Sequence, residues 1–312
     1  MTYSIVARDP ATGDLGVAVQ SHYFGTGRLV TWAEAGVGAV ATQSIVEVSY
    51  GPHGLDLMRS GVAADHALGR LIASDQMETV RQVAMVDAKG VIGTHTGAGC
   101  VGQAGHRHGN QVSAQANMME RDTVWGAMID AYDQTAGHDL AERMLVALEA
   151  AEAEGGDVRG KQSAAILVVS GERSDAPWDQ RKVDLRVDDS KAPLVEIRRL
   201  LDVNRAVERL TKVFESGLLF APTVDARDPE FALALDDLEA AQSGLGANRE
   251  PTFWSAVLLA KAGKIDAART KLAFAAETNQ RWNLFLRSLA AAGVLPADNA
   301  LLNGRRSRST GR

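Results

Sequence analysis

The hydrophobic and polar positions of the chain follow two different periods, which alternate along its first two hundred residues. Short apolar runs that are rich in β-branched residues and bounded by glycine, proline or aspartate are typical of strands. They predict strands at residues 3–7, 15–20, 29–32, 37–42, 80–86, 91–96, 111–117, 162–169 and 182–187. Apolar residues spaced by three and four predict helices at 54–73, with a break at Gly61, and at 123–154 and 192–214. Residues 50–54 are predicted as a turn, and the glycine- and histidine-rich segment 97–110 as a loop.

This order of elements favours an α+β domain built from antiparallel strands over a βαβ repeat. Strand–turn–strand units lie on both sides of a helical segment. We therefore expect two packed sheets with helices on their outer faces.

Beyond residue 220 the pattern becomes helical. Residues 220–230 form a charged, proline-containing linker, and helices are predicted at 230–243, 251–262, 265–278 and 282–291. The pair 251–278, with a glycine in its turn, resembles one tetratricopeptide unit. One such unit does not bury its own apolar face, so we expect it to pack on neighbouring helices. The predicted domains are 1–215 and 216–303, followed by a basic, serine-rich tail at 304–312 that we expect to be disordered.

The composition limits the class of protein. A net charge of −6 argues against nucleic acid as the main partner. No apolar run reaches the roughly 18–20 residues that would span a membrane, and no secretory leader precedes the first strand. Cys100 is the single cysteine, which excludes an intrachain disulfide and a thiolate metal cluster. We expect a cytoplasmic protein.

The second residue, Thr2, is the first candidate for chemistry. A small residue after Met1 favours removal of the methionine, which would leave a hydroxyl and a free α-amine on one residue. An α-amine with a pKa of roughly 7.7–8.0 can accept the hydroxyl proton directly or through one water, and this makes the hydroxyl a useful nucleophile. The alternative interpretation is that Thr2 is an ordinary residue that starts an edge strand.

Further candidates follow from the ends of the predicted strands. Asn117 is our candidate donor to an oxyanion, although it would equally cap the turn that follows it. Gln20 and Ser21 end the second strand, where they either lie beside Thr2 and bond its α-amine or pair backbone groups.

A second polar group lies near residue 160. Gln162 and Ser163 open a buried strand, as a strand entrance or as a wall of the site. Asp188 and Asp189 follow a strand and precede a helix, so that helix capping is the alternative to a role in the site.

The histidines suggest a metal site as an alternative. His106 and His108 would share one face of a strand, with His95 and His22 elsewhere in the chain. Helical HxxxH spacing and clustered carboxylates are both lacking in the sequence, so we expect no metal and no other cofactor. Cys100 could act as a nucleophile with His95, but a lone cysteine is more often a small buried residue.

Several ordered motifs carry a resemblance to a known family. They are residues 2–21, GVGAVATQS at 36–44, YGPHGL at 50–55, HTGAGC at 95–100, AQANMM at 114–119, GDVRGKQSAAILVV at 156–169 and VDLRVDD at 183–189. Over residues 2 to about 205 the chain resembles the DUF1028 family, whose fold is placed among the N-terminal nucleophile (Ntn) hydrolases. The resemblance implies a four-layer αββα sandwich with Thr2 as the nucleophile. Ala116 stands where the family more often has glycine, which departs from the pattern beside Asn117.

These observations together lead to two functional hypotheses. The first is an amidohydrolase that cleaves a small amide, N-acyl compound or peptide through an acyl-enzyme on Thr2. The second is a binding or scaffold protein that keeps the fold without turnover and contacts a partner through its C-terminal helices. A homodimer is expected for either. Residues expected to bind the substrate are Gln20, Ser21, His22, Gln43, His95, Gln162, Ser163 and Asp188.

Overall fold

The computed structural model describes residues 2–296 and 298–302, and the chain forms two compact units, Met1–Leu201 and Asp202–Arg312. The expected tail at 304–312 lies outside the described residues. Each unit has its own hydrophobic core.

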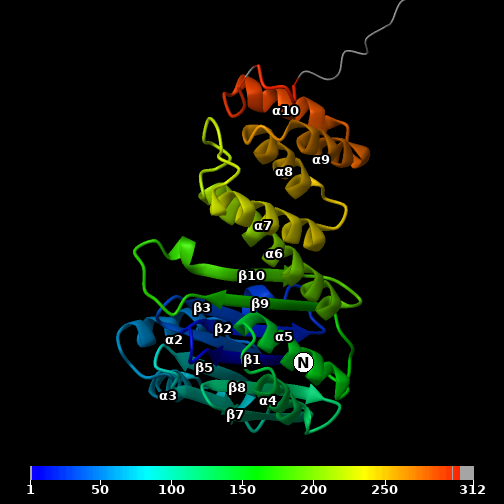
Figure 1. Ribbon diagram of the computed structural model, residues 1–312. Coiled ribbons are helices and arrows are strands. Elements are labelled where there is room, and N and C mark those ends of the chain that lie inside the picture. The colour runs from blue at the N-terminus through cyan, green and yellow to red at the C-terminus, as the bar shows by residue number, and fades with distance from the viewer. Residues whose placement is uncertain (1, 297, 303–312) are drawn as a thin grey trace, which may run out of the picture. The chain divides into compact units, whose positions relative to one another are not determined.

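The first unit contains two antiparallel sheets (Figure 1). The larger sheet has the order β10-β9-β2-β1-β8-β7, so that the first strand of the chain lies in its middle. Its strands are β1 (Thr2–Arg8), β2 (Leu15–Ser21), β7 (Gln103–Gly109), β8 (Val112–Met119), β9 (Ser163–Val169) and β10 (Arg181–Val187). The smaller sheet follows chain order: β3 (Thr31–Glu34), β4 (Gly38–Ser44), β5 (Arg81–Asp87) and β6 (Ile92–Thr96).

The sheets pack face to face, because their strands are apolar on both sides. On β1, Val6 joins the core between the two sheets, whereas Tyr3 and Ile5 point to the opposite face and pack under helices. On β5, Ala84 likewise faces the other sheet, and Met85 packs under helices on the outer side. The prediction of an α+β unit with two packed sheets and outer helices is confirmed.

The helices of this unit cover the two outer faces (Figure 1). Helices α4 (Val124–Gln134) and α5 (Leu140–Ala153) pack on the larger sheet, and α2 (Tyr50–Arg59) and α3 (Ala64–Ser74) on the smaller one. Three further short elements are α1 (Gly27–Val30) and the 3₁₀ turns η1 (Glu78–Val80) and η2 (Pro177–Gln180). Helix α6 (Pro193–Glu215) contributes Leu194, Ile197 and Leu201 to the core of the first unit.

Two of the local predictions, at 50–54 and 97–110, were wrong. The predicted turn at 50–54 is the beginning of α2, because Pro52 lies in the first turn of the helix, where a missing N–H costs no hydrogen bond. The predicted loop at 97–110 contains strand β7 at the edge of the larger sheet. Its side chains are mostly polar and partly exposed, so that the apolar alternation of a strand is missing from the sequence.

Two other segments are divided differently from the prediction. The predicted helix 123–154 is two helices, since Gly137 adopts a φ of +95° between them and Asp139 caps α5 by accepting a hydrogen bond from the Glu142 amide. The predicted strand at 29–32 begins as α1 and becomes β3 at Thr31. The predicted break near Gly61 is confirmed, and Gly61 has a φ of +94°.

The second unit is all-helical, as predicted, with α7 (Pro229–Leu245), α8 (Glu250–Lys261), α9 (Ile265–Thr278) and α10 (Arg281–Ala291). Helix α8 is its centre, because every side chain from Pro251 to Lys261 is buried. Phe253 is fully buried and stacks on Trp282 of α10, with ring centroids 4.9 Å apart. The hairpin of α8 and α9 therefore packs against α10, which fits the expectation that it needs a neighbour.

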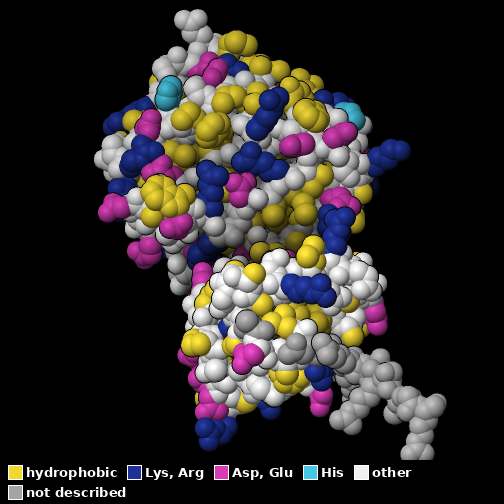
Figure 2. Space-filling view, turned by 90° about the horizontal axis from the view of Figure 1, so that it is seen from above, with side chains coloured by type: hydrophobic (Ala, Val, Ile, Leu, Met, Phe, Trp, Pro, Cys, Tyr) yellow, Lys and Arg dark blue, Asp and Glu magenta, His cyan; other side chains and the backbone are white. Residues whose placement is uncertain are grey.

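The surface carries mixed charges. Lysine, arginine, aspartate and glutamate side chains are interspersed over the face seen in Figure 2. Among the described residues, none of the helices combines the length and the apolar character needed to cross a membrane.

Candidate functional site

Thr2 lies at the meeting point of three strands. The register of the larger sheet pairs Thr2 with Ser21 on one side and with Asn117 on the other. All three side chains are at least nine-tenths buried. The Thr2 Oγ1 and Ser21 Oγ atoms are 3.0 Å apart, which is a hydrogen bond between the two hydroxyl groups. The structure thus brings together Thr2, Ser21 and Asn117, which are far apart in the sequence.

A cluster of buried amides fixes the backbone of Thr2 from both sheets. The Nε2 atom of Gln43 and the Nδ2 atom of Asn117 donate to the carbonyl oxygen of Thr2, at 3.3 and 3.4 Å. Both also donate to Oε1 of Gln82, at 2.7 and 2.9 Å. Gln82 is fully buried on β5 and donates in turn to the Ala116 carbonyl at 2.8 Å. These bonds hold the first residue of β1 in one position relative to the smaller sheet.

The same cluster leaves two acceptors without a partner. Among the described residues, Oε1 of Gln43 and Oδ1 of Asn117 are buried and accept no hydrogen bond. An asparagine amide has two N–H donors, and those of Asn117 point to Thr2 and Gln82. In this arrangement Asn117 therefore presents an acceptor rather than the free donor that an oxyanion would need.

Beside this cluster is a pocket of about 240 Å³. Thr2, Ser21 and Gln43 line it, and its apolar wall is formed by Leu29, Val30, Ile45, Val46 and Met118. Tyr23 and Ile45 are about half exposed, at 52% and 50%, so that the apolar wall extends to the surface. Arg159 is the one charged side chain among the described residues that line the pocket.

The backbone is strained at two points of this pocket. Ser44 and Met118 both line it, and they have φ angles of 71° and 57°. Non-glycine residues rarely adopt this conformation, and such strain is concentrated at functional sites. Each of the two directly follows an amide of the buried cluster, Gln43 on β4 and Asn117 on β8. The strained C-terminal ends of β4 and β8 therefore shape the pocket beside Thr2.

Arg159 is held by a buried carboxylate. The side chain of Asp157 is fully buried, and its Oδ2 atom lies 3.2 Å from Nη2 of Arg159. Asp157 also accepts hydrogen bonds from the backbone amides of His22 and Arg159. The sequence analysis did not select Asp157, Arg159 or Gln82. The signal for Asp157 and Arg159 was a charged segment that precedes a strand. The signal for Gln82 was one polar residue within an apolar strand.

Ser163 supports the pocket without lining it. Its Oγ atom donates to the Tyr23 carbonyl and accepts from the Thr26 amide at 3.1 Å, and both of these residues line the pocket. Gln162 donates to Asp189, and its backbone amide to the Ser21 carbonyl. Asp188 is exposed, and its backbone carbonyl accepts from the Gly25 amide. Neither Gln162 nor Asp188 is among the described residues of the pocket.

Gln20 lies on the opposite face of the sheet from the pocket. Because side chains alternate along a strand, the neighbour of Ser21 points toward α5, where Gln20 contacts the hydroxyl of Tyr3. That hydroxyl also donates to Glu152 at 2.7 Å. Burial and the Glu152 carboxylate raise the pKa of Tyr3. The structure therefore does not place the Gln20 side chain in the Thr2 pocket.

The two histidines expected to bind the substrate, His22 and His95, are not among the described residues that line the Thr2 pocket. His95 contacts the backbone carbonyl of Glu78 at 2.8 Å, and Cys100 donates to the Arg81 carbonyl at 3.3 Å. His22 is half-buried beside Gly160 and, like His95, is absent from the described lining of the pocket. Among the described residues, no group of three or more histidines, cysteines or acidic side chains is placed to hold a metal.

His106 gives the first unit a testable pH dependence. Its Nδ1 atom lies 2.9 Å from the Thr96 hydroxyl, and partial desolvation followed by the nearby His108 and His95 lowers its pKa. Stability from this group is therefore fully present above the ordinary histidine pKa of about 6.5 and is lost as the pH falls through the lowered value. We expect the midpoint temperature of unfolding to be lower at pH 5 than at pH 7. This difference should be smaller in His106→Gln than in the unaltered protein.

The control for this measurement is His138→Gln, in the exposed turn between α4 and α5. This variant should keep the pH dependence of the unaltered protein. Identical pH profiles for His106→Gln and the unaltered protein would contradict the prediction.

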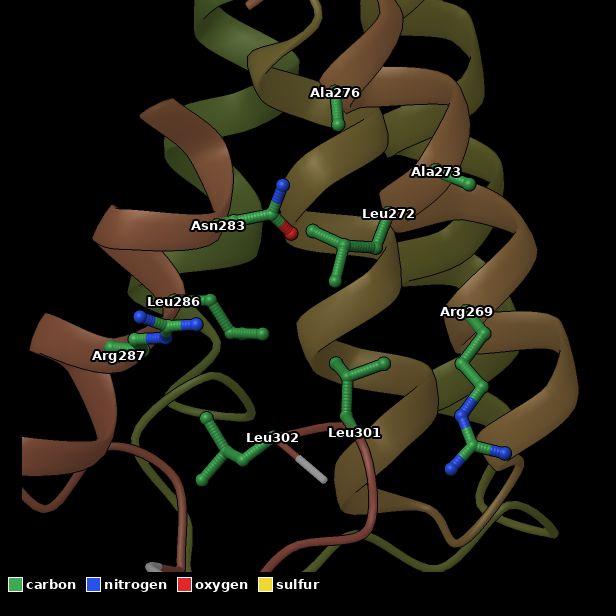
Figure 3. Close-up of a pocket in the computed structure, with 9 residues that line it drawn as sticks. All are labelled: Arg269, Leu272, Ala273, Ala276, Asn283, Leu286, Arg287, Leu301 and Leu302. Atoms are coloured by element: carbon green, nitrogen blue, oxygen red, sulfur yellow. The ribbon is translucent and has the colours of Figure 1, made fainter. Parts of the chain in front are cut away.

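A larger pocket, of about 410 Å³, lies within the helical unit (Figure 3). Its lining is apolar at Leu272, Leu286 and Leu301, with Arg269 and Arg287 at its sides. The described residues that line it include no nucleophile and no acid–base group. This pocket is suited to binding, whereas the pocket at Thr2 carries a hydroxyl that can react.

The comparisons with known proteins agree with this architecture. Residues 2–197 match the model of a family described as "Family of unknown function (DUF1028)". The chain belongs to the DUF1028 family. The match includes every described residue that lines the Thr2 pocket and ends within α6, so that the helical unit lies beyond it.

A solved structure of a DUF1028 protein is similar to this chain. It is the crystal structure of protein SPO2555 from Silicibacter pomeroyi, with 29% sequence identity and a TM-score of 0.58. The similarity covers 64% of this chain and 84% of SPO2555. A search of the curated proteins found no match.

Proposed function

We propose that this DUF1028 protein is an amide hydrolase of the N-terminal nucleophile type, with the four-layer αββα sandwich of that superfamily. One observation carries the proposal. The hydroxyl of Thr2, the second residue of the chain, lies in a pocket beside a second hydroxyl, with its backbone fixed by buried amides. The strained residues Ser44 and Met118 at the same pocket support it.

The reaction requires that Met1 is removed. The free α-amine of Thr2 then accepts the proton of the Thr2 hydroxyl, and the hydroxyl oxygen attacks the carbonyl carbon of the amide. As the C–N bond breaks, the proton moves from the α-amine to the departing nitrogen, which leaves an ester on Thr2. Water attacks this ester, with the α-amine again as base, and releases a carboxylic acid while the Thr2 hydroxyl is restored.

The surrounding residues have positioning roles in this proposal. Ser21 orients the Thr2 hydroxyl through the bond of 3.0 Å. Gln43 and Asn117 hold the Thr2 carbonyl, so that the hydroxyl stays in line with the pocket. Asn117 thus acts on the nucleophile, because both its N–H donors are directed at Thr2 and Gln82.

The first test is the intact mass of untagged protein from its native host, with N-terminal sequencing. We expect a mass without Met1 and threonine as the first residue, because a small second residue favours removal of the methionine. A retained Met1 would leave Thr2 without its base and would contradict the proposed function.

A second candidate function is binding without turnover. The observation that favours it is the pocket of Figure 3, whose leucines and two arginines suit an apolar, acidic peptide. A retained Met1 together with peptide binding by the helical unit would support this candidate over hydrolysis.

A further inference from the structure

We infer that the Thr2 pocket accepts an N-acylated amino acid, with an apolar acyl chain, a secondary amide N–H and a free carboxylate. The inference builds on the proposed hydrolysis, since it names the substrate class of the same site. Its test is binding, which does not depend on turnover.

The apolar wall of the pocket fits the acyl chain. Leu29 and Val30 of α1 face the same pocket as Ile45 and Val46, which follow β4. The exposed Tyr23 continues this wall to the surface. Contiguous apolar side chains exposed beside a polar cluster mark a surface where an apolar ligand is removed from water.

The unpartnered oxygen of Gln43 fits the amide N–H. Gln43 lines the pocket, is 1% exposed, and its Oε1 atom has no hydrogen-bond partner among the described residues. A buried acceptor without a donor is costly, so a ligand that supplies an N–H is favoured. An ester, or an amide methylated at nitrogen, supplies no donor and is discriminated against.

Arg159 fits the carboxylate. It is the one charged side chain among the described residues that line the pocket, and 38% of its side chain is exposed. The buried carboxylate of Asp157 fixes the guanidinium, which lowers the entropy lost when a ligand binds. A guanidinium has five N–H donors in a planar fork, which matches a carboxylate better than an ammonium does.

The three features together define one class of ligand. A carboxylate, an N–H and an apolar chain occur in this order in an N-acyl amino acid. Attack by Thr2 on the acyl carbonyl would break the bond between the acyl group and the nitrogen. The products would be a fatty acid and a free amino acid.

The test is calorimetric binding to Thr2→Ala, which keeps a small second residue but has no nucleophile. The probes are N-hexanoylglycine, N-hexanoylglycinamide, which lacks the carboxylate, and N-hexanoylsarcosine, which lacks the N–H. We expect N-hexanoylglycine to bind at least about tenfold more tightly than either of the others, because each lacks one hydrogen-bonded group.

A second variant locates the carboxylate. Adding Arg159→Gln to Thr2→Ala should reduce the affinity for N-hexanoylglycine to that for the glycinamide and leave the glycinamide unchanged. Arg107→Gln is the matched control, because Arg107 pairs with Asp130 on another part of the same unit. It should have no effect on either probe.

Equal affinities for the three probes, or no binding of any of them at millimolar concentration, would overturn the inference. So would an Arg159→Gln variant that binds N-hexanoylglycine as tightly as its parent. If the protein that lacks Met1 binds N-hexanoylglycine selectively but does not hydrolyse it, the proposed hydrolysis is contradicted and the inferred ligand class is supported. If the protein hydrolyses other amides without selectivity for the probe that carries a carboxylate, the proposed hydrolysis is supported and the inferred ligand class is contradicted.

Discussion

Replacing Thr2 with alanine in protein that lacks Met1 is expected to lower kcat/KM for amide hydrolysis by roughly 10³-fold or more, as loss of a nucleophile does in other hydrolases. The change removes the hydroxyl that attacks the substrate. The fold should survive, because the substitution removes one hydrogen bond to Ser21, worth about 1 kcal/mol. The measurement is steady-state kinetics of both proteins, with thermal unfolding as the check on the fold.

Two further variants define what the hydroxyl does. Thr2→Ser keeps both the hydroxyl and the α-amine and should retain measurable turnover. Thr123→Ala removes the same group from an exposed position and should leave kcat/KM unchanged. Equal activity of Thr2→Ala and the unaltered protein would show that Thr2 is not the nucleophile.

Replacing Gln82 with methionine is expected to lower the free energy of unfolding of the first unit by about 3 kcal/mol. Methionine has a similar length but neither donates nor accepts as an amide does. The Ala116 carbonyl would lose the hydrogen bond from Gln82, and the Gln43 and Asn117 amides would lose a shared acceptor. All these groups are buried, so that water does not replace the lost bonds.

The measurement is urea unfolding, compared with Gln134→Met, an exposed position at the end of α4. The control should change the free energy of unfolding by less than about 0.5 kcal/mol. A Gln82→Met protein as stable as this control would show that the amide cluster does not stabilise the inter-sheet layer.

Much of the fold could be predicted from the sequence because it depends on local patterns. Continuous apolar runs at residues 3–7 and 15–20, with turn residues between them, indicated the first hairpin, and a spacing of three and four indicated α6. Strand β7 was missed because an exposed edge strand with polar side chains has no such apolar run.

The candidate site was predictable only in part. Thr2 and Ser21 lie on strands joined by a short turn, so their pairing follows from the register of one hairpin. The same register, with side chains alternating between faces, places Gln20 on the opposite side of the sheet. Residue type and position in the sequence suggested both Gln20 and Ser21 for the site. The pleat of the strand places only the Ser21 side chain on the side of Thr2 that faces the pocket.

The sequence by itself determined that the first strand is buried, and that an α+β unit precedes a helical one. Only the tertiary structure decided that β8 lies beside β1, that Gln82 of β5 accepts a hydrogen bond from Asn117 of β8, and that Arg159 lines the same pocket as Thr2. The order of the strands determines which residues come into contact across the two sheets. This order depends on which distant segments pack together, and a local hydrophobic period does not predict it.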